Sequence, residues 1–378
     1  AKSNATIMCY GMGITQHQEG SQLVQQVANL LLLKGNFGKK GAGIAPIRGH
    51  SNVQGDRTVG IDEKPTQAYL DRVRDVFGFE PPREHGHHVI EAVEAMEAGT
   101  AKVFFGMGGN FVRAIPDTER SYAAMAKLDL TVGIATKLNR GHLIHGKEAL
   151  ILPVVARSEI IRTSAGEQFV TIEDAMSNVT PSRGVFEPVS PDVRPETEIV
   201  CRVAMATLPE SKIPWADYIE DYSLIRDKIA EVYPAIYTGF SEKMKDPHGF
   251  HLDIPPRRRV WMTPNGKANF LVLPGLTVDD VIDDPAMLRL ATIRSHDQYN
   301  TTIYSNNDRY RGVYNTRMVI FMNKEDREAR GLENGAVVGL ETYSDDGYRR
   351  YVDGLTILDY PMSRGSIAGY YPELNPLL

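Results

Sequence analysis

Helical periodicity runs through the first quarter of the chain. At residues 21–33 the apolar side chains fall at positions 23, 24, 27, 28, 31 and 32, which predicts an amphipathic helix that ends at Gly35. Similar patterns predict a helix at residues 66–77, closed by Gly78, and another at residues 89–98. Packing into a core is the expected role of these three apolar faces.

Residues 103–154 show the order of elements that is typical of a parallel sheet. A continuous apolar strand at 103–105 is followed by a glycine turn at 106–110, a helix at 117–127, a strand at 130–135 and another strand at 148–154. This order predicts parallel strands with helices packed on the faces of the sheet. In such sheets, ligands bind beyond the carboxyl ends of the strands.

The pattern changes in the second half of the chain. Residues 157–256 contain many prolines and long irregular joins between two helical patterns at 195–207 and 214–232, which indicates a connecting, partly helical region. Strand patterns dominate beyond Val260. These strands are expected at residues 269–273, 290–294, 317–322, 336–342 and 348–358. Their spacing predicts a small closed barrel or a sandwich.

Composition narrows the class of protein. At 378 residues, with 42% hydrophobic and 24% charged content, the chain is long enough to bury a sizeable core. The net charge of −6 argues against general nucleic-acid binding, which needs clustered lysine and arginine. No apolar run is long enough for a membrane span and no signal peptide is evident, so we expect a cytoplasmic protein without a membrane partner.

The chain contains two cysteines, Cys9 and Cys201. They are far apart and neither belongs to a CxxC pair. A zinc or iron–sulfur site built from thiolates of this chain is therefore not expected, and we predict no metal ligand in it.

A short polar loop at residues 48–55 is the first candidate for chemistry. Arg48 supplies a fixed cation, His50 a titratable imidazole, and Asn52 and Gln54 two amides, in an irregular connection after a predicted helix. Such a loop can surround a small polar reactant. A solvated or structural turn is the alternative interpretation.

Two successive strand ends offer groups that hold phosphate. The turn at 106–110 presents backbone amides, and residues 136–140 add a hydroxyl and two cations after the next strand. The first turn lacks the full GxGxxG fingerprint, so an ordinary tight turn is the alternative. We expect a phosphate-bearing ligand across this edge of the sheet. The polar loop at 294–300, beyond a buried strand, is a further candidate, with a solvated loop as its alternative.

Several motifs, in order along the chain, resemble those of one enzyme family. They are Gly11-Met12-Gly13-Ile14-Thr15-Gln16, the glycine-rich run at 33–43, Pro46-Ile47-Arg48-Gly49-His50-Ser51-Asn52-Val53-Gln54-Gly55, Gly106-Met107-Gly108-Gly109-Asn110, Ala149-Leu150-Ile151-Leu152-Pro153, Thr263-Pro264-Asn265-Gly266-Lys267-Ala268 and Thr292-Ile293-Arg294. This ordered set resembles the molybdopterin oxidoreductases of the dimethyl-sulfoxide-reductase superfamily, in the branch of the formate-dehydrogenase-like alpha subunits. The resemblance covers nearly the whole chain.

The resemblance implies a molybdenum or tungsten ion held by two molybdopterin guanine dinucleotides. It implies that one nucleotide contacts Gly106, Gly108, Gly109, Asn110, Thr136, Lys137 and Asn139. It also implies that pterin and phosphate contact Arg294 and the loop that follows it, with Ser295, Asp297, Gln298 and Asn300.

The resemblance gives the 48–55 loop a catalytic role. Arg48 matches the arginine that formate dehydrogenases place beside the metal, where it would hold an anionic substrate or oxo group. His50 stands where formate dehydrogenases have glutamine, which favours proton transfer by His50 and separates the expected substrate from formate. Ser295 and Gln298 likewise replace an acidic residue and a histidine of the formate-enzyme pattern.

The implied fold class is α/β, with parallel-sheet domains followed by a C-terminal double-psi β-barrel. We predict the end of an α/β domain with the active-site loop at 1–55 and an α/β nucleotide-binding domain at 56–156. A mixed connecting region follows at 157–262, and the cofactor-binding barrel occupies 263–378.

Members of the family are longer than this chain. Their cluster cysteines and the residue that ligates the metal lie in an N-terminal half that is absent here, so any iron–sulfur cluster is expected only in that half. We therefore expect the C-terminal part of an oxidoreductase that acts by two-electron transfer on a small anionic substrate, with an electron carrier as partner. The alternative is a non-catalytic module that binds pterin or nucleotide.

Overall fold

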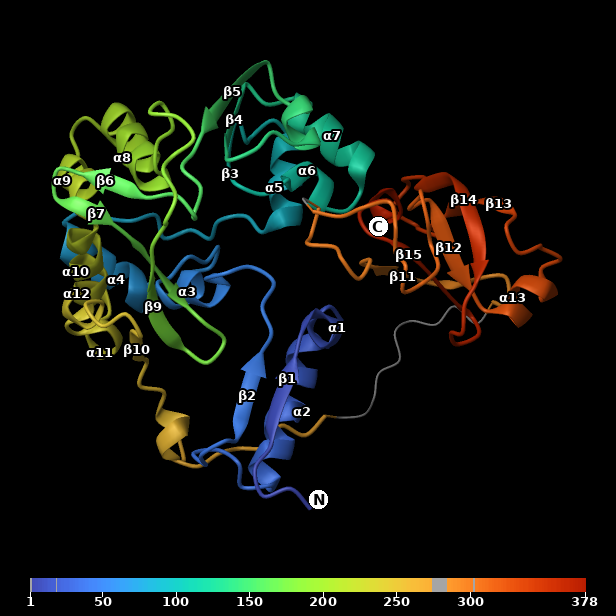
Figure 1. The fold of residues 1–378 in the computed structure, drawn as a ribbon, viewed down its shortest axis with the longest axis horizontal. Helices are drawn as coiled ribbons and strands as arrows, with labels where there is room; N and C mark the ends of the chain where they lie inside the picture. The colour runs from blue at the N-terminus through green and yellow to red at the C-terminus, as the bar shows by residue number, and fades with distance from the viewer. Residues whose placement is uncertain (1, 18, 274–283, 302) are drawn as a thin grey trace. The chain divides into compact units, whose positions relative to one another are not determined.

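The computed structural model describes residues 2–17, 19–273, 284–301 and 303–378 (Figure 1). The fold is mixed α/β, as predicted, and its packing divides the chain into two compact units. The first unit joins Ala1–Gly86 to Val155–Asp280, and the second joins His87–Val154 to Val281–Leu378. The four domains expected from the sequence divide the chain differently, and their boundaries stay a prediction.

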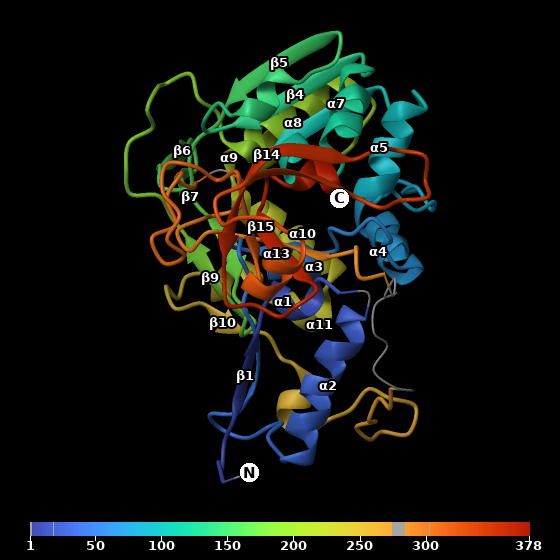
Figure 2. The ribbon, with the colours of Figure 1, turned by 90° about the vertical axis from the view of Figure 1, so that its right-hand side faces the viewer.

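The first unit begins with two parallel strands, β1 (Ile7–Tyr10) and β2 (Gly43–Pro46). Helices α1 (Met12–Thr15) and α2 (Gly20–Leu33) connect them, and α2 lies beside the strands (Figure 2). Helix α2 confirms the helix predicted at residues 21–33. Its Leu31 is fully buried, as the periodicity of the apolar positions requires.

Helix α4 (Gln67–Phe77) confirms the helix predicted at 66–77. The Thr66 hydroxyl caps its first turn by accepting a hydrogen bond from Tyr69 N at 3.3 Å. Gly78 ends the helix with a φ of 72°, a left-handed conformation that glycine adopts without strain.

Residues 157–256 contain more regular structure than the sequence pattern indicates. The short strands are β6 (Ile161–Thr163), β7 (Gly166–Gln168), β8 (Val170–Glu173), β9 (Asn178–Ser182) and β10 (Phe250–His251). The helices are α8 (Glu196–Thr207), α9 (Trp215–Glu220), α10 (Tyr222–Val232), α11 (Pro234–Tyr237), α12 (Phe240–Lys243) and the 3₁₀ turn η2 (Pro255–Arg258). A three-stranded antiparallel sheet has the order β10-β9-β8, and β6 pairs with β7.

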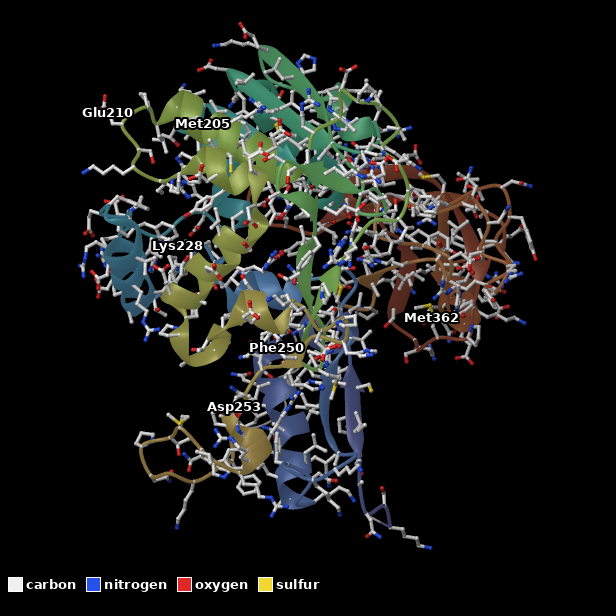
Figure 3. The ribbon with its side chains drawn as sticks, turned by 60° about the vertical axis from the view of Figure 1, so that its left-hand side comes forward. Met205, Glu210, Lys228, Phe250, Asp253 and Met362 are labelled. Carbon is white, nitrogen blue, oxygen red and sulfur yellow. The ribbon has the colours of Figure 1, made fainter. Side chains whose placement is uncertain are left out.

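These elements share a core that includes Val179, Tyr237, Phe240 and Met244, with Phe250 packed against it from β10 (Figure 3). The single helix predicted at 214–232 is wrong, because α9 and α10 are separate helices. Asp221 lies between them with an extended backbone, at φ −137° and ψ 106°. Its carboxylate caps α10 by accepting a hydrogen bond from Ser223 N at 2.8 Å.

The second unit opens with a parallel three-stranded sheet in the order β3-β4-β5, which confirms the βαβ prediction. Its strands are β3 (Val103–Met107), β4 (Leu130–Ala135) and β5 (Glu148–Pro153). Its helices are α5 (Val89–Glu97), α6 (Phe111–Ala114), α7 (Thr118–Ala126) and the 3₁₀ turn η1 (Arg140–Leu143). Val93, Met96, Val112, Met125 and Leu128 form the core beneath the helices.

A five-stranded mixed sheet completes the second unit, in the order β11-β15-β12-β14-β13. The strands are β11 (Arg289–Ile293), β12 (Val319–Met322), β13 (Val337–Glu341), β14 (Tyr351–Asp359) and β15 (Ser366–Tyr370). Helix α13 (Lys324–Ala329) follows β12, and the 3₁₀ turn η3 (Asn375–Leu377) lies near the C-terminus. All four residues of β12 are buried, so this strand is covered on both faces.

Four of the five strands predicted beyond Val260 are confirmed, and the one at 269–273 is wrong. There the backbone of Leu271 bonds to a side chain, because Asn29 Nδ2 donates to Leu271 O at 2.7 Å and Asn29 Oδ1 accepts from Leu271 N at 3.3 Å. These groups of Leu271 therefore have no part in a strand ladder. Among the residues that the structure describes, no helix is long and apolar enough to cross a membrane.

Candidate cofactor-binding and active site

The turn after β3 lies at the carboxyl end of the parallel sheet, where the Gly108 N–H donates to Ile134 O of β4 at 2.7 Å. Gly108 and Gly109 have left-handed backbones, with φ of 67° and 68°, and a Cβ added at either position would meet nothing within 4 Å. Glycine is therefore required by backbone conformation rather than by crowding. The predicted turn is shorter than expected, since Gly106 lies inside β3 opposite Gly133 of β4.

Asn139 joins this turn to the loop after β4. Its Nδ2 donates to Gly109 O at 2.9 Å, and its Oδ1 accepts from Gly141 N at 2.9 Å, where it caps η1. Nδ2 thus joins the two loops, and Oδ1 orders the loop after β4. Asn139 therefore positions the loops, whether or not it also contacts a ligand.

Asn110 differs from Asn139 in having an unused acceptor. The residue is 9% exposed, and its Oδ1 is buried without a hydrogen-bond partner. A buried acceptor of this kind is uncommon in proteins. Its position, next to the glycine turn, suits a donor group on a bound molecule.

A cleft of about 900 Å³ adjoins these loops within the second unit. Both strand-end loops line it, and they contribute the predicted residues Gly108, Gly109, Asn110, Thr136, Lys137 and Asn139. Residues of the C-terminal segment line it as well, with the rings of Tyr299 and Tyr304 and the carboxylate of Glu373. Arg113 and Arg140 add positive charge to that of Lys137. The volume lies within the range of about 300–1,000 Å³ that is typical of ligand sites.

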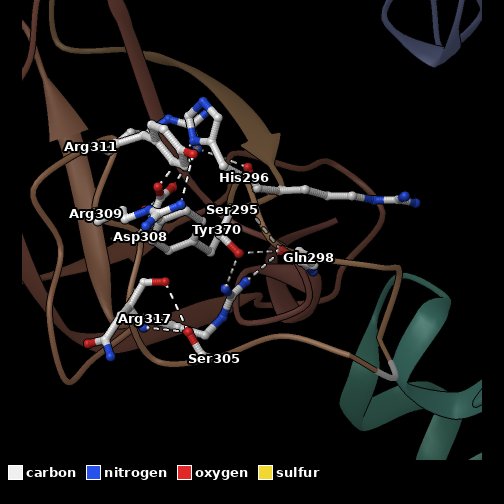
Figure 4. A network of polar contacts seen from close by, with 12 residues as sticks. Ser295, His296, Gln298, Ser305, Asp308, Arg309, Arg311, Arg317 and Tyr370 are labelled. Carbon is white, nitrogen blue, oxygen red and sulfur yellow. Dashed lines mark hydrogen bonds and ion pairs between the residues drawn. The ribbon is translucent and has the colours of Figure 1, made fainter.

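The other predicted cofactor residues do not line this cleft, although Tyr299 of the 294–300 loop does; they are Gly106, Arg294, Ser295, Asp297, Gln298 and Asn300. In that loop, Ser295 and Gln298 belong to a network around Arg317 (Figure 4). Arg317 is 4% exposed and donates to Ser295 Oγ and to Gln298 Oε1, both at 2.9 Å. Its Nε pairs with a Glu373 carboxylate oxygen at 2.9 Å. These bonds use the side chains of Ser295 and Gln298 to shape the loop.

Asp308 forms a second buried charge cluster under the same loop (Figure 4). Its carboxylate accepts from Arg311 Nη1 at 2.7 Å and from the Tyr370 hydroxyl at 3.0 Å, and lies 3.1 Å from His296 Nδ1. Burial raises the pKa of Asp308, but the hydrogen bonds from its three partners lower it further, so the pKa lies below its ordinary value. The carboxylate therefore stays ionised at neutral pH.

Arg294, Asp297 and Asn300 have different surroundings. The guanidinium of Arg294 lies 5.7 Å from the ring centroid of Tyr371, and no ion pair joins it to any residue that the structure describes. Asp297 is exposed. Asn300 Oδ1 accepts a hydrogen bond from the Tyr371 hydroxyl at 2.8 Å. Arg294 is thus the cation of this loop with most freedom to meet an anion.

The 48–55 loop belongs to the first unit. Arg48 and His50 are exposed there, and Arg48 Nη2 makes a long contact of 3.4 Å with Gln54 Oε1. The loop is less irregular than predicted, because helix α3 (Val53–Thr58) begins within it. Asn52 precedes that helix with a φ of 66°, and its Oδ1 accepts from Glu173 N of β8 at 2.9 Å. This bond fixes the loop to the antiparallel sheet.

Sequence reasoning missed the residues that hold the loops in place, above all Arg317 and Asp308. Arg317 opens the apolar run that predicts a strand at residues 317–322. A single arginine at the start of this run is the sequence signal that could have indicated a buried charge network. Asp308 has no local signal. No group of three or more His, Cys, Asp or Glu side chains that could hold a metal ion occurs in the described residues.

Comparison with known proteins shows the family of this chain. Residues 1–142 match the family model for molybdopterin oxidoreductases, and residues 288–346 match the Molydopterin dinucleotide binding domain. The chain belongs to the molybdopterin oxidoreductase family. The two matched segments include the strand-end loops and the 294–300 loop described above.

Similar members of this family differ in how much their names say. Protein YdeP of Escherichia coli (strain K12) is 47% identical over 380 residues, which are 100% of this chain and 50% of that protein. Uncharacterized oxidoreductase Rv2900c of Mycobacterium tuberculosis is 46% identical over 383 residues, 100% of this chain and 48% of that protein. Formate dehydrogenase H of E. coli K12 is 24% identical over 365 residues, 89% of this chain and 48% of that protein. The chain thus spans about half the length of these relatives.

The solved structure of acetylene hydratase from Pelobacter acetylenicus matches this molybdopterin oxidoreductase with a TM-score of 0.50. The match covers 80% of this chain and 42% of the acetylene hydratase chain, at 17% sequence identity. At this identity the likeness concerns the fold alone. Nothing in these comparisons favours the alternative of a non-catalytic module.

Proposed function

We propose that this chain is part of a molybdopterin oxidoreductase that binds a bis-molybdopterin guanine dinucleotide cofactor, with molybdenum or tungsten, and acts on a small anionic substrate. The observation that supports this most is the cleft of about 900 Å³, since its walls come from segments that match the two family models. When bound, the metal of such a cofactor accepts or donates two electrons.

The described residues fit the dinucleotide. The Gly108 N–H donates to Ile134 O of β4 at 2.7 Å and fixes the glycine turn, and Arg113, Lys137 and Arg140 supply positive charge for phosphate groups in the same cleft. The buried Oδ1 of Asn110 lacks a donor, which an N–H or O–H group of the nucleotide would provide. Arg294 would hold a phosphate or pterin group from the C-terminal segment, which we propose to be a double-psi β-barrel.

The exposed loop at 48–55 would supply the substrate contacts. Among the described residues, the Arg48 guanidinium makes one long contact, to Gln54, so it is available to orient an anion through charge-assisted hydrogen bonds. His50 would accept or donate the proton that accompanies a two-electron step, at its imidazole nitrogen. The anchor formed by Asn52 limits how far this loop can move.

The activity is that of a longer protein, since the chain spans about half the length of its relatives. We propose that the other half supplies the remaining ligand of the metal and any iron–sulfur cluster, and that a separate carrier exchanges electrons. A small anion of the size of formate is the substrate class that Arg48 suits. His50 makes formate itself a weaker candidate than another small oxyanion or carboxylate.

The test uses the full-length protein. We expect metal and pterin analysis to find molybdenum or tungsten with pterin. Arg48→Ala should then lower substrate-dependent reduction of an artificial electron acceptor by about a hundredfold or more, with cofactor content unchanged, because a mispositioned substrate loses reactive geometry.

Arg57→Ala, in the exposed ion pairs that follow the loop, is the matched control and should leave turnover unchanged. Absence of metal and pterin from the full-length protein would refute the proposed function. Loss of cofactor in Arg48→Ala would assign Arg48 a structural role.

A further inference from the structure

A buried cation without a counter-ion lies in the first unit, outside the residues assigned above. Arg226 on α10 is 8% exposed, and no ion pair joins it to another residue in the described part of the chain. Its Nη1 donates to Phe169 O at 3.3 Å, and its guanidinium lies 4.3 Å from the centroid of the Phe169 ring. Its Nε is buried with no hydrogen-bond partner. Burying a charge in this state is unfavourable unless something else compensates it.

The nearest carboxylates already have other partners. Asp221 accepts from Ser223 N as the cap of α10, and Asp227 Oδ1 accepts from the Ser241 hydroxyl at 2.7 Å. A second cation, Arg183, lies 3.9 Å from the same Phe169 ring and adds to the positive charge. Among the described residues, no negatively charged group is therefore in direct contact with Arg226.

Arg226 lines a cavity of about 210 Å³ whose other walls are mostly apolar, with Val179, Ile229 and Phe240 among them. Glu173 lines it too; this residue is 4% exposed, and its Oε2 is buried without a hydrogen-bond partner. Burial raises the pKa of Glu173 more than hydrogen bonds with Thr58 and Ser177 lower it. No ion pair joins Glu173 to Arg226 among the residues that the structure describes, so Glu173 does not neutralise Arg226 by direct contact.

We propose that this cavity binds a small organic carboxylate, with Arg226 as its anchor. The buried Nε of Arg226 would donate to one carboxylate oxygen, which supplies the missing partner and the missing negative charge. The apolar walls fit a short alkyl chain, and the cavity volume limits the ligand to a few carbon atoms. Glu173 Oε2 is a second polar atom without a partner, and it would accept a hydrogen bond from a hydroxyl group on the ligand.

The site adjoins the base of the 48–55 loop. Asn52 and Gly55 both line the cavity, and Asn52 Oδ1 accepts from the backbone N of Glu173. A bound carboxylate would therefore contact the segment that anchors the loop and reduce its mobility. The binding site itself does not depend on the proposed oxidoreductase function.

The test titrates the full-length protein with acetate, butyrate and inorganic phosphate and follows binding by calorimetry. We expect butyrate to bind in the millimolar range or tighter, more strongly than acetate, and phosphate not to bind at this site. Arg226→Met should weaken butyrate binding by at least about tenfold, because the charged hydrogen bonds are lost. Amide exchange in residues 52–59 should slow when butyrate is bound to the unaltered protein.

If Arg226→Met does not fold, Arg226→Lys tests the site, because lysine keeps the positive charge. Arg226→Lys should also bind butyrate more weakly than the unaltered protein, since lysine lacks the planar guanidinium group. Arg202→Met, an exposed arginine of the same unit, is the control and should bind butyrate normally. Without ligand, Arg226→Met should unfold at the same or a higher temperature than the unaltered protein. The proposal is wrong if butyrate fails to bind or if phosphate binds and butyrate does not. It is also wrong if Arg226→Met strongly lowers the unfolding temperature, because that result would mean that a carboxylate elsewhere in the full-length protein pairs with Arg226.

Discussion

Arg317 is the single residue on which the shape of the 294–300 loop depends most. It contacts Ser295, Gln298 and Glu373, and it also donates to Tyr371 O at 2.8 Å. Removing one member of a buried charge network leaves the others unpaired. This lowers the stability of the folded state more than the absence of the whole network would. The loop and residues 371–373, near the C-terminus, therefore share one arginine as their common support.

Arg317→Met should destabilise the second unit by about 3 to 5 kcal/mol, because Glu373 would be left buried and unpaired. Denaturant unfolding of the full-length protein measures this loss. The exposed Arg309, which also lies between β11 and β12, is the control, and Arg309→Met should change stability by no more than about 0.5 kcal/mol. Equal, small effects of both substitutions would show that the Arg317 network contributes little.

Asp308 should make the second unit sensitive to acid. Its pKa lies below the ordinary value of 3.8, so its contribution to stability is complete above that value and is lost as the pH falls through the lower folded-state pKa. Asp308→Asn should be less stable than the unaltered protein at neutral pH, and the difference should shrink below about pH 4. Unfolding measured at neutral and acid pH tests this. A difference that does not change with pH would contradict it.

The glycine turn after β3 is the element whose conformation matters most for the proposed cofactor. Gly109 needs a left-handed backbone, with open space where a side chain would stand. Its carbonyl also receives the bond from Asn139 that joins the two strand-end loops. Any residue with a Cβ therefore strains the backbone of the turn, although the Cβ meets no atom within 4 Å.

Gly109→Ala should lower stability by about 1 to 2 kcal/mol and reduce cofactor content. The matched control is Gly99→Ala, at the end of α5, where φ is 70° and the strain is equal, but the residue does not line the cleft. The control should lose similar stability and keep its cofactor. Pterin content per protein, measured beside unfolding, separates the two effects. Full cofactor content in Gly109→Ala would argue against a role for this turn in binding.

At the scale of the whole second unit, a few contacts join the parallel sheet to the C-terminal segment. Asn375 is 1% exposed, and its Nδ2 donates to Arg113 O at 2.8 Å and to Ile115 O at 3.1 Å. Arg350 pairs with Asp117 at 2.8 Å. Since residues of both segments line the cleft, these contacts set the distance between its walls.

Asn375→Ala should cost about 1 to 3 kcal/mol, because two buried carbonyls lose their donor, and cofactor content should fall with it. Asn323→Ala is a matched control from the same segment. Asn323 caps α13 by accepting from Glu325 N at 2.8 Å and does not line the cleft. It should lose stability without loss of cofactor. Normal pterin content in Asn375→Ala would show that the cleft does not depend on this contact.

The sequence by itself determined the elements whose signals are local. Helices α2 and α4 and strands β3 to β5 follow from the spacing of apolar residues, and caps such as Thr66 and Gly78 follow from backbone chemistry. The ordered motifs gave the family, because their residue types are tied to one cofactor. They also pointed to six residues, predicted to contact the cofactor, that line one cleft in the structure.

Only the tertiary structure decided how the loops are held and where charges are left without partners. Arg317 lies 56 residues from Glu373, and Asn375 lies 262 residues from Arg113, so no local pattern records either contact. The surroundings of Arg226, which has no ion pair in the described part of the chain, were hidden for the same reason, since its partner Phe169 lies 57 residues away. A helical period shows which face is buried, but not which distant side chain meets it, and it is these long-range pairs that fix the geometry of both proposed sites.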